Sequence, residues 1–193
     1  MGRWEPDARA RLLRAALDLF CEQGYENTSV AQIAERAGLT KSTYFRHFRD
    51  KREVLFGGQD ELLELVGSGI AGAPESAGPL AAVEAALVAM AVTFTPERWE
   101  IGTRRLSVIN RTDELRERDA LKMAGFRHAM RDSLRQRGVS ELDADVAAEL
   151  GVLALRRGYA RWLEDGGDFA EVARRALGEI QVAAAELKGA EQL

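Results

Sequence analysis

Residues 28–51 have the sequence TSVAQIAERAGLTKSTYFRHFRDK, and this stretch decides how the N-terminal part of the chain folds. Ser29 and Gln32 have the spacing of a helix-capping pair, and the apolar residues that follow recur at helical intervals. Gly38 is typical of a helix end, and Thr40 can cap a second, short helix. The stretch therefore predicts two helices joined by a tight glycine turn, which is the arrangement of a helix-turn-helix.

Charge is unevenly distributed along the chain. The chain has 193 residues, of which 46% are hydrophobic, and this is enough for a substantial core. The formal net charge of −4 would by itself argue against nucleic-acid binding. Residues 1–52, however, hold ten Lys or Arg and seven Asp or Glu, whereas residues 53–193 hold 17 and 24. Because the basic excess lies around the helix-turn-helix, that region stays a candidate for binding nucleic acid.

Residue types that carry catalysis or hold metals are few and scattered. Cys21 is the single cysteine, and His47 and His128 lie 81 positions apart, so the sequence offers no metal-ligand cluster and no nucleophile with its base. It also contains no phosphate-binding loop or nucleophile elbow. We therefore expect no enzyme, no cofactor and no metal site. Without a disulfide, a signal-peptide pattern or an apolar run of roughly 18 to 20 residues, we expect a cytoplasmic protein that does not enter a membrane.

Helical periodicity continues on both sides of the helix-turn-helix. A first helix is expected over residues 7–23, and a fourth, connecting helix over about residues 50–68, with a bend at the glycine pair Gly57-Gly58. Five more helices are expected near residues 80–94, from residue 96, and over about residues 113–137, 142–164 and 168–188. The predicted fold is all-α, with about nine helices and no strand.

Several of these residues together resemble the TetR family of bacterial transcriptional regulators. The resemblance covers about residues 8–56, and the helical remainder agrees with the family only in length and helix count. It implies a DNA-binding domain over residues 1–52 and an effector-binding and dimerisation domain over residues 53–193. The residues that carry it are the first helix, Gly24-Tyr25, Ile33-Ala34, Ala37-Gly38-Leu39 and Phe48-x-x-Lys51.

The second helix of the helix-turn-helix carries the expected contacts to a double-stranded DNA operator. Lys41 is suited to donate to guanine, and short hydroxyl side chains beside it can meet base edges or phosphates. The resemblance places His47 and Lys51 at phosphate-contacting positions. Phe45 stands where the family commonly has a phosphate-binding tyrosine, so that contact is either lost or taken over by Tyr44. The predicted DNA-binding residues are Gln32, Thr40, Lys41, Ser42, Thr43, Tyr44, Arg46, His47 and Lys51.

Each of these residues also has a plainer interpretation. Thr40 can act only as a helix cap, Arg46 as a solvated charge, and His47 as a surface histidine. It is the concentration of such residues on one short helix after a glycine turn that favours the DNA-binding interpretation.

The resemblance also implies a homodimer and a pocket for a small-molecule effector. The last two helices, 142–164 and 168–188, would pair with their counterparts in a four-helix bundle, unless their apolar faces are satisfied within one chain. The three helices before them would enclose the effector, unless their apolar residues are ordinary core. The pocket candidates are Met90, Phe94, Trp99, Met123, Phe126 and Met130. The dimer-interface candidates are Leu150, Leu153, Ala160, Ala173, Leu177 and Ile180.

These expectations combine into a transcriptional repressor that binds a palindromic operator as a homodimer and is released by an effector. The effector would move the connecting helix and change the spacing of the two DNA-binding heads. The alternative is a helical, dimeric module that binds a ligand or a protein and does not bind DNA.

Overall fold

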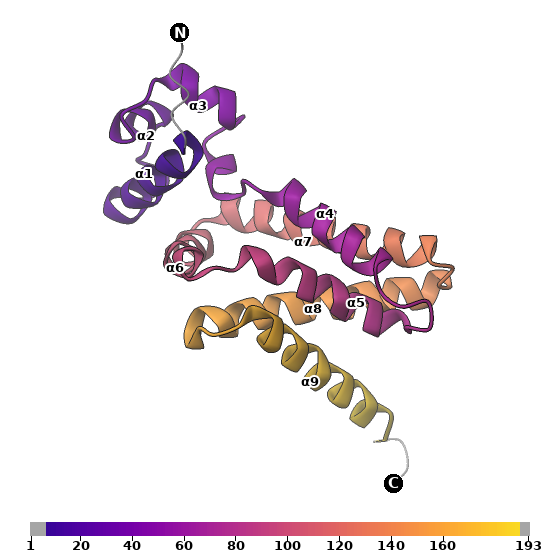
Figure 1. Cartoon of the computed structure of the whole chain (residues 1–193). Coiled ribbons are helices and arrows are strands. Elements are labelled where there is room, and N and C mark those ends of the chain that lie inside the picture. The colour runs from indigo at the N-terminus through magenta and orange to yellow at the C-terminus, as the bar shows by residue number, and fades with distance from the viewer. Residues whose placement is uncertain (1–6, 190–193) are drawn as a thin grey trace. The chain divides into compact units, whose positions relative to one another are not determined.

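The structure is a computed structural model that describes residues 7–189, and within that range it is all-α (Figure 1). Nine α-helices and no strand occur in the described part of the chain, which confirms the predicted fold class. The elements are α1 (Ala8–Gln23), α2 (Val30–Arg36), α3 (Lys41–His47), the 3₁₀ helix η1 (Arg52–Leu55), α4 (Gln59–Ala71), α5 (Pro79–Met90), the 3₁₀ helix η2 (Ala91–Thr93), α6 (Pro96–Asn110), α7 (Asp113–Gln136), α8 (Glu141–Asp165) and α9 (Phe169–Gly189).

The helix-turn-helix forms as its caps predict. The side chains and backbones of Ser29 and Gln32 bond reciprocally, with Gln32 N donating to Ser29 Oγ at 3.3 Å and Ser29 N donating to Gln32 Oε1 at 2.8 Å. Gly38 ends α2 in the left-handed region, at a φ of 66°, which side chains other than glycine rarely adopt. Thr40 Oγ1 then accepts from the backbone of Thr43 at 3.1 Å and starts α3.

The connecting helix differs from the prediction of one bent helix over residues 50–68. Asp50 Oδ1 accepts from Glu53 N at 3.1 Å and starts η1, but the helical turn ends at Leu55 and α4 begins only at Gln59. Gly58 lies between them with a φ of 85°. Two adjacent glycines weaken a helix, and a left-handed residue breaks it, so the predicted bend is a complete interruption.

Two compact units share the chain, and two helices belong to both. The first unit comprises the described residues up to Gly58 together with Glu100–Ala120. The second comprises Gln59–Trp99 and the described residues from Leu121 onward. The first unit thus holds α1, α2, α3, η1, most of α6 and the start of α7, and the second holds the remaining helices.

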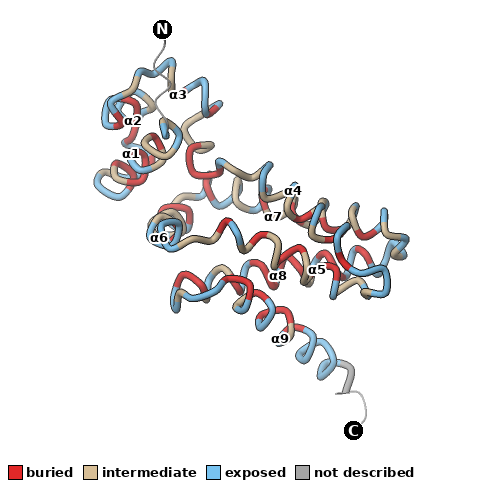
Figure 2. The backbone as a smooth tube through the Cα atoms, in the orientation of Figure 1, coloured by how far each residue is buried: buried red, intermediate tan, exposed pale blue. Residues whose placement is uncertain are grey.

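The first unit has one hydrophobic core beneath α1, α2 and α3 (Figure 2). In it, α2 packs against α1 and α3, and η1 packs against α1. The end of α6 and the start of α7 contribute Val108, Ile109 and Leu115, so this core is not closed by the N-terminal residues alone. Its fully buried members include Leu12, Ala16, Leu17, Ile33, Tyr44 and Leu115.

In the second unit, α5 packs against α4, α8 and α9, and α8 packs against α9. The apolar residues of α5 are buried between these neighbours, with Val83 and Leu87 at 0% exposure. Among the described residues no single helix is long and apolar enough to cross a membrane, although α5 with η2 and α6 would satisfy the same criteria as a sharply bent pair.

Candidate nucleic-acid interface

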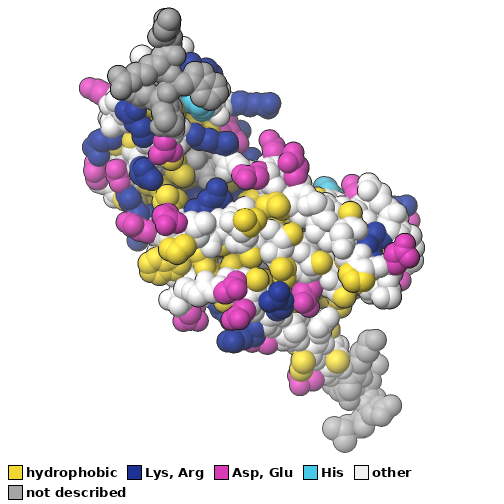
Figure 3. Space-filling view, in the orientation of Figure 1, with side chains coloured by type: hydrophobic (Ala, Val, Ile, Leu, Met, Phe, Trp, Pro, Cys, Tyr) yellow, Lys and Arg dark blue, Asp and Glu magenta, His cyan; other side chains and the backbone are white. Residues whose placement is uncertain are grey.

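The recognition helix α3 has one buried and one exposed side. Tyr44 and Phe48, four residues apart, are buried in the core of the first unit. Lys41, Ser42, Phe45, Arg46 and His47 are exposed. The short helix therefore presents two cations, a hydroxyl, a histidine and an aromatic ring to solvent. In the space-filling view, Lys and Arg side chains are seen over the part of the first unit that holds α1, α2 and α3 (Figure 3).

Tyr44 does not belong to this exposed side. Its side chain is 0% exposed, and its hydroxyl lies 3.0 Å from the carbonyl oxygen of Asp50 and 3.2 Å from that of Lys51. Burial, followed by the negative charge of Asp50, raises the pKa of the Tyr44 phenol well above its ordinary value. The prediction that Tyr44 contacts DNA, or replaces a phosphate contact missing at Phe45, is wrong for this conformation, because the hydroxyl binds backbone carbonyls inside the domain.

Arg46 near the end of α3 and Arg49 shortly after it have no partner among the described residues. Arg46 and Arg49 are exposed and make no hydrogen bond or ion pair with the residues that the structure describes. By contrast, Arg36 on α2 forms a bidentate ion pair with Glu22, at 2.8 and 2.9 Å. Arg46 was predicted as a phosphate contact, whereas Arg49 was missed. The signal for Arg49 was its position three residues after Arg46 in the basic segment.

The resemblance implied that Lys51 contacts a DNA phosphate, but its side chain binds within the domain. Its ammonium group donates to the carbonyl oxygen of Tyr25 at 2.8 Å and lies 3.9 Å from the centre of the Tyr25 ring. Lysine has three donors, so a phosphate contact would use one of the other two. In this position Lys51 connects the end of the helix-turn-helix to the loop after α1, whether or not it also contacts a phosphate.

His47 is exposed and carries an altered pKa. The pKa lies below its ordinary value of 6.5, first because of partial burial and then because of the positive charges of Arg46 and Arg9. The lowered pKa favours the uncharged imidazole in the free protein. A negatively charged phosphate beside the ring would favour the protonated imidazole.

The remaining predicted polar contacts are accessible, but some already have local roles. Gln32 is exposed while its amide serves the cap of α2, and Thr40 Oγ1 caps α3 and lies 3.0 Å from Thr43 Oγ1. Ser42 is exposed and makes no hydrogen bond through its side chain with the described residues. A local bond through one lone pair leaves the second lone pair of a threonine oxygen available.

Three of the six predicted pocket residues lie in the packed core of the second unit. Met90, Phe126 and Met130 are at most 1% exposed. Phe94 stacks on Phe169 with ring centres 3.6 Å apart, and Met123 is half-buried. Trp99 is 38% exposed, and its indole nitrogen donates to the carbonyl oxygen of Trp162 at 3.0 Å.

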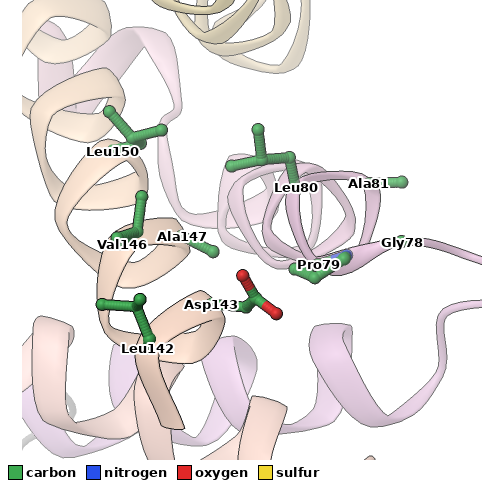
Figure 4. A pocket seen from close by; sticks show the side chains of 9 residues that line it. All are labelled: Gly78, Pro79, Leu80, Ala81, Leu142, Asp143, Val146, Ala147 and Leu150. Carbon is green, nitrogen blue, oxygen red and sulfur yellow. The ribbon is translucent and has the colours of Figure 1, made fainter. Parts of the chain in front are cut away.

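An open groove in the second unit is lined by none of these six residues. It has a volume of about 470 Å³ and lies between the starts of α5 and α8. Figure 4 shows Leu142, Val146 and Leu150 along one side of α8, with Pro79 and Leu80 at the start of α5. The other lining residues are Gly78, Ala81, Asp143 and Ala147.

The dimer-interface candidates divide into two groups. Ala173, Leu177 and Ile180 are only 0%, 1% and 7% exposed, because α9 packs its apolar side against α5 and α8 of the same chain. The prediction that they face a partner is therefore wrong in this structure. The outward candidates are Leu153, which is 44% exposed, with Ala160 exposed and Leu150 half-buried.

The helix-turn-helix residues have counterparts in known proteins. Residues 12–58 match the family model described as bacterial regulatory proteins, tetR family. The helix-turn-helix region of this chain is therefore similar to the N-terminal part of TetR-family regulators. The HTH-type transcriptional regulator TcmR of Streptomyces glaucescens is 54% identical over 46 residues, which are 24% of this chain and 20% of TcmR. The HTH-type transcriptional regulator AcrR of Shigella flexneri is 38% identical over 64 residues, or 33% of this chain and 28% of AcrR.

The alignments with these two regulators thus span less than a third of their lengths. The fold is similar to solved structures over most of the chain. The solved complex of SmeT with triclosan superposes with a TM-score of 0.61 and 19% identity, covering 91% of this chain and 90% of SmeT. A further structure describes SmeT as the repressor of the Stenotrophomonas maltophilia multidrug efflux pump SmeDEF.

Proposed function

We propose that this chain is a cytoplasmic transcriptional repressor of the TetR family that binds a palindromic DNA operator as a homodimer and is released by a small-molecule effector. The observation that carries the proposal is the exposed side of α3, where Lys41, Arg46 and the nearby Arg49 are not held in ion pairs with other described residues. The relatives with the same domain are transcriptional regulators, and SmeT, which shares the fold, was solved with a bound small molecule.

The proposed contacts follow from what each exposed side chain can donate. Lys41 donates to guanine in the major groove, and Ser42 contacts a neighbouring base edge or phosphate. Arg46, Arg49 and His47 contact phosphates, which fix the position of α3 on the duplex without carrying sequence information. In this proposal, residues 1–52 bind DNA, and residues 53–193 bind the effector and form the dimer.

The decisive experiment compares the duplex upstream of the protein's own coding region with a random duplex at two salt concentrations. The proposal expects a clear preference for the upstream duplex and a binding constant that falls steeply with salt, because each phosphate contact releases counterions. Equal binding to both duplexes would favour the alternative of a helical module that does not recognise an operator.

Lys41→Ala and Arg46→Ala are expected to weaken binding in different ways. Losing a base contact costs about 1–3 kcal/mol and relaxes the preference at one position of each half-site. Losing a phosphate contact weakens all duplexes alike and reduces the salt slope by about one per site. Titrations of operator variants at several salt concentrations distinguish the two effects, with the exposed Arg98→Ala as the control. Identical behaviour of the two variants would contradict these roles.

Operator affinity is expected to increase as the pH falls. The lowered pKa of His47 favours the neutral ring in the free protein, and a phosphate beside it would raise that pKa. Binding then takes up a proton, so affinity rises as the pH falls through the interval between the bound-state and free-state pKa values. Binding curves between about pH 5 and 8 measure the effect. His47→Gln should flatten the dependence and His128→Gln should not; an unchanged dependence in His47→Gln would exclude the contact.

Leu153→Glu is expected to convert the proposed dimer to a monomer. Leu153 is an exposed apolar residue of α8, on the same side of the helix as Val146, and a buried carboxylate there would have no partner. Sedimentation or light scattering measures the change. Leu121→Glu is the matched control, because this leucine of α7 is 68% exposed and should tolerate the charge. A dimer that survives Leu153→Glu would place the interface elsewhere.

A further inference from the structure

Phe45 is an unusual residue in the first unit. It is 48% exposed, and among the described residues of this unit it is the only exposed large apolar side chain. The aromatic residues on either side of it along α3, Tyr44 and Phe48, are buried. The exposure therefore singles out one position on the recognition helix and is not a property of a loosely packed domain.

The ring of Phe45 is held from two sides within α3. It packs edge-on against Tyr44, with ring centres 5.7 Å apart and an angle of 81° between the planes. The ammonium group of Lys41, one helical turn earlier, lies 5.9 Å from its centre. These contacts position the ring and leave half of its surface free for a partner outside the chain.

Chemistry limits what that partner can be on DNA. A phenyl ring has no donor for a phosphate oxygen or for a base edge. In the major groove, the C5-methyl group of thymine is the apolar group that base edges present, and side chains such as phenylalanine contact it directly. Resting on the proposed DNA-binding function, we propose that Phe45 recognises a thymine methyl group and so determines part of the operator sequence.

The position of Lys41 adds a constraint on that sequence. Lys41 and Phe45 are four residues apart, about 6 Å along the axis of α3. Successive base pairs are about 3.4 Å apart. The thymine that Phe45 contacts therefore lies within about two base pairs of the guanine that Lys41 contacts, so each half-site contains a closely spaced guanine and thymine.

The test removes the methyl group and nothing else. A duplex selected by the protein from a random library is resynthesised with deoxyuridine in place of thymine, one symmetric pair of positions at a time. At the symmetric pair of positions that Phe45 contacts, replacing thymine with deoxyuridine should lower the affinity about fourfold for each lost methyl contact. The loss for both half-sites together should be roughly 15-fold. The same substitution should have no such effect in Phe45→Ala, which should bind the thymine and deoxyuridine duplexes equally.

Two controls separate recognition from general damage. Phe45→Leu keeps an apolar side chain and should keep a reduced preference for thymine, while Leu121→Ala changes an even more exposed apolar residue of α7 and should leave the preference unchanged. Thermal unfolding of Phe45→Ala should stay close to that of the wild type, because about half of the ring already faces solvent.

The outcomes distinguish this inference from the function on which it rests. If the wild-type protein selects an operator but no deoxyuridine position alters its affinity, or if Phe45→Ala keeps the thymine preference, the ring packs against the sugar-phosphate backbone and the inference is overturned alone. If the wild-type protein selects no sequence at all, the proposed function is overturned and the inference with it.

Discussion

Gly69→Ala is expected to destabilise the second unit by about 2 kcal/mol, even though alanine favours helices more than glycine does. A Cβ at Gly69 would lie 2.6 Å from Ala86 Cα, 3.0 Å from Ala86 N and 3.0 Å from Ala85 O. These are backbone atoms of α5, so no side chain can rotate to make room. The added methyl group would instead force α4 and α5 apart along their contact.

Thermal unfolding measures the effect, with an expected decrease in Tm of roughly 4–8 °C. Gly67→Ala is the matched control on the same helix, because a Cβ there would meet only Ser133 Oγ, at an ordinary 3.7 Å. That variant should be neutral or slightly stabilised by the better helix propensity of alanine. Equal Tm values for the two variants would show that α4 and α5 are not in close contact at Gly69.

Gly69 also illustrates why the sequence placed the end of α4 only approximately, within the segment of residues 67–79. The segment after residue 66 is rich in glycine and proline, and local propensity predicted that the helix would end near residue 68. The helix continues to Ala71. Its glycines permit a close approach to α5, which stabilises the helix through packing that no local pattern reveals.

The helix-turn-helix, in contrast, was predictable because its determinants are local. The capping pair Ser29 and Gln32, the left-handed Gly38 and the cap at Thr40 lie within twelve residues of one another and need no other part of the chain. What the same stretch left open was which of Tyr44 and Phe45 is buried. That choice depends on the backbone carbonyls of Asp50 and Lys51, which come together only in the folded domain.

The sequence also could not predict which helices cover the apolar side of α9. Its apolar periodicity predicted a buried face but could not say whether the same chain or a partner buries it. In the structure α5 and α8 cover Ala173, Leu177 and Ile180, because α5 is apolar on more than one side and can contact several helices at once. A dimer would therefore use the outward residues of α8 and α9.

The contribution of α6 and α7 to the first unit depends on ion pairs between residues far apart in sequence. Arg104 of α6 pairs with Asp18 of α1 at 2.6 Å, and Arg118 of α7 pairs with Glu53 of η1 through two bonds of 2.6 and 3.0 Å. Both pairs link the N-terminal residues to Glu100–Ala120. The compact unit that holds the helix-turn-helix therefore includes residues beyond the boundary expected near residue 52.

Arg118→Ala is expected to destabilise the first unit by about 2 kcal/mol. The Arg118 and Glu53 side chains are only 18% and 25% exposed, so removing the guanidinium leaves a carboxylate that water solvates incompletely. The guanidinium also lies 4.9 Å from the centre of the Phe56 ring, and this contact would be lost. Hydrogen exchange of the α1 and α3 backbone amides, together with thermal unfolding, measures the change in this unit.

Arg116→Ala is the matched control, because Arg116 pairs with Asp113 on the same helix but both side chains are more than half exposed. Its loss should change the stability by less than about 0.5 kcal/mol. The double variant Glu53→Gln with Arg118→Met removes both charges and should recover part of the stability lost in Arg118→Ala, because the unpaired carboxylate is then absent. If the double variant were less stable than Arg118→Ala alone, the cost would come from lost packing around Phe56 and not from the isolated charge of Glu53.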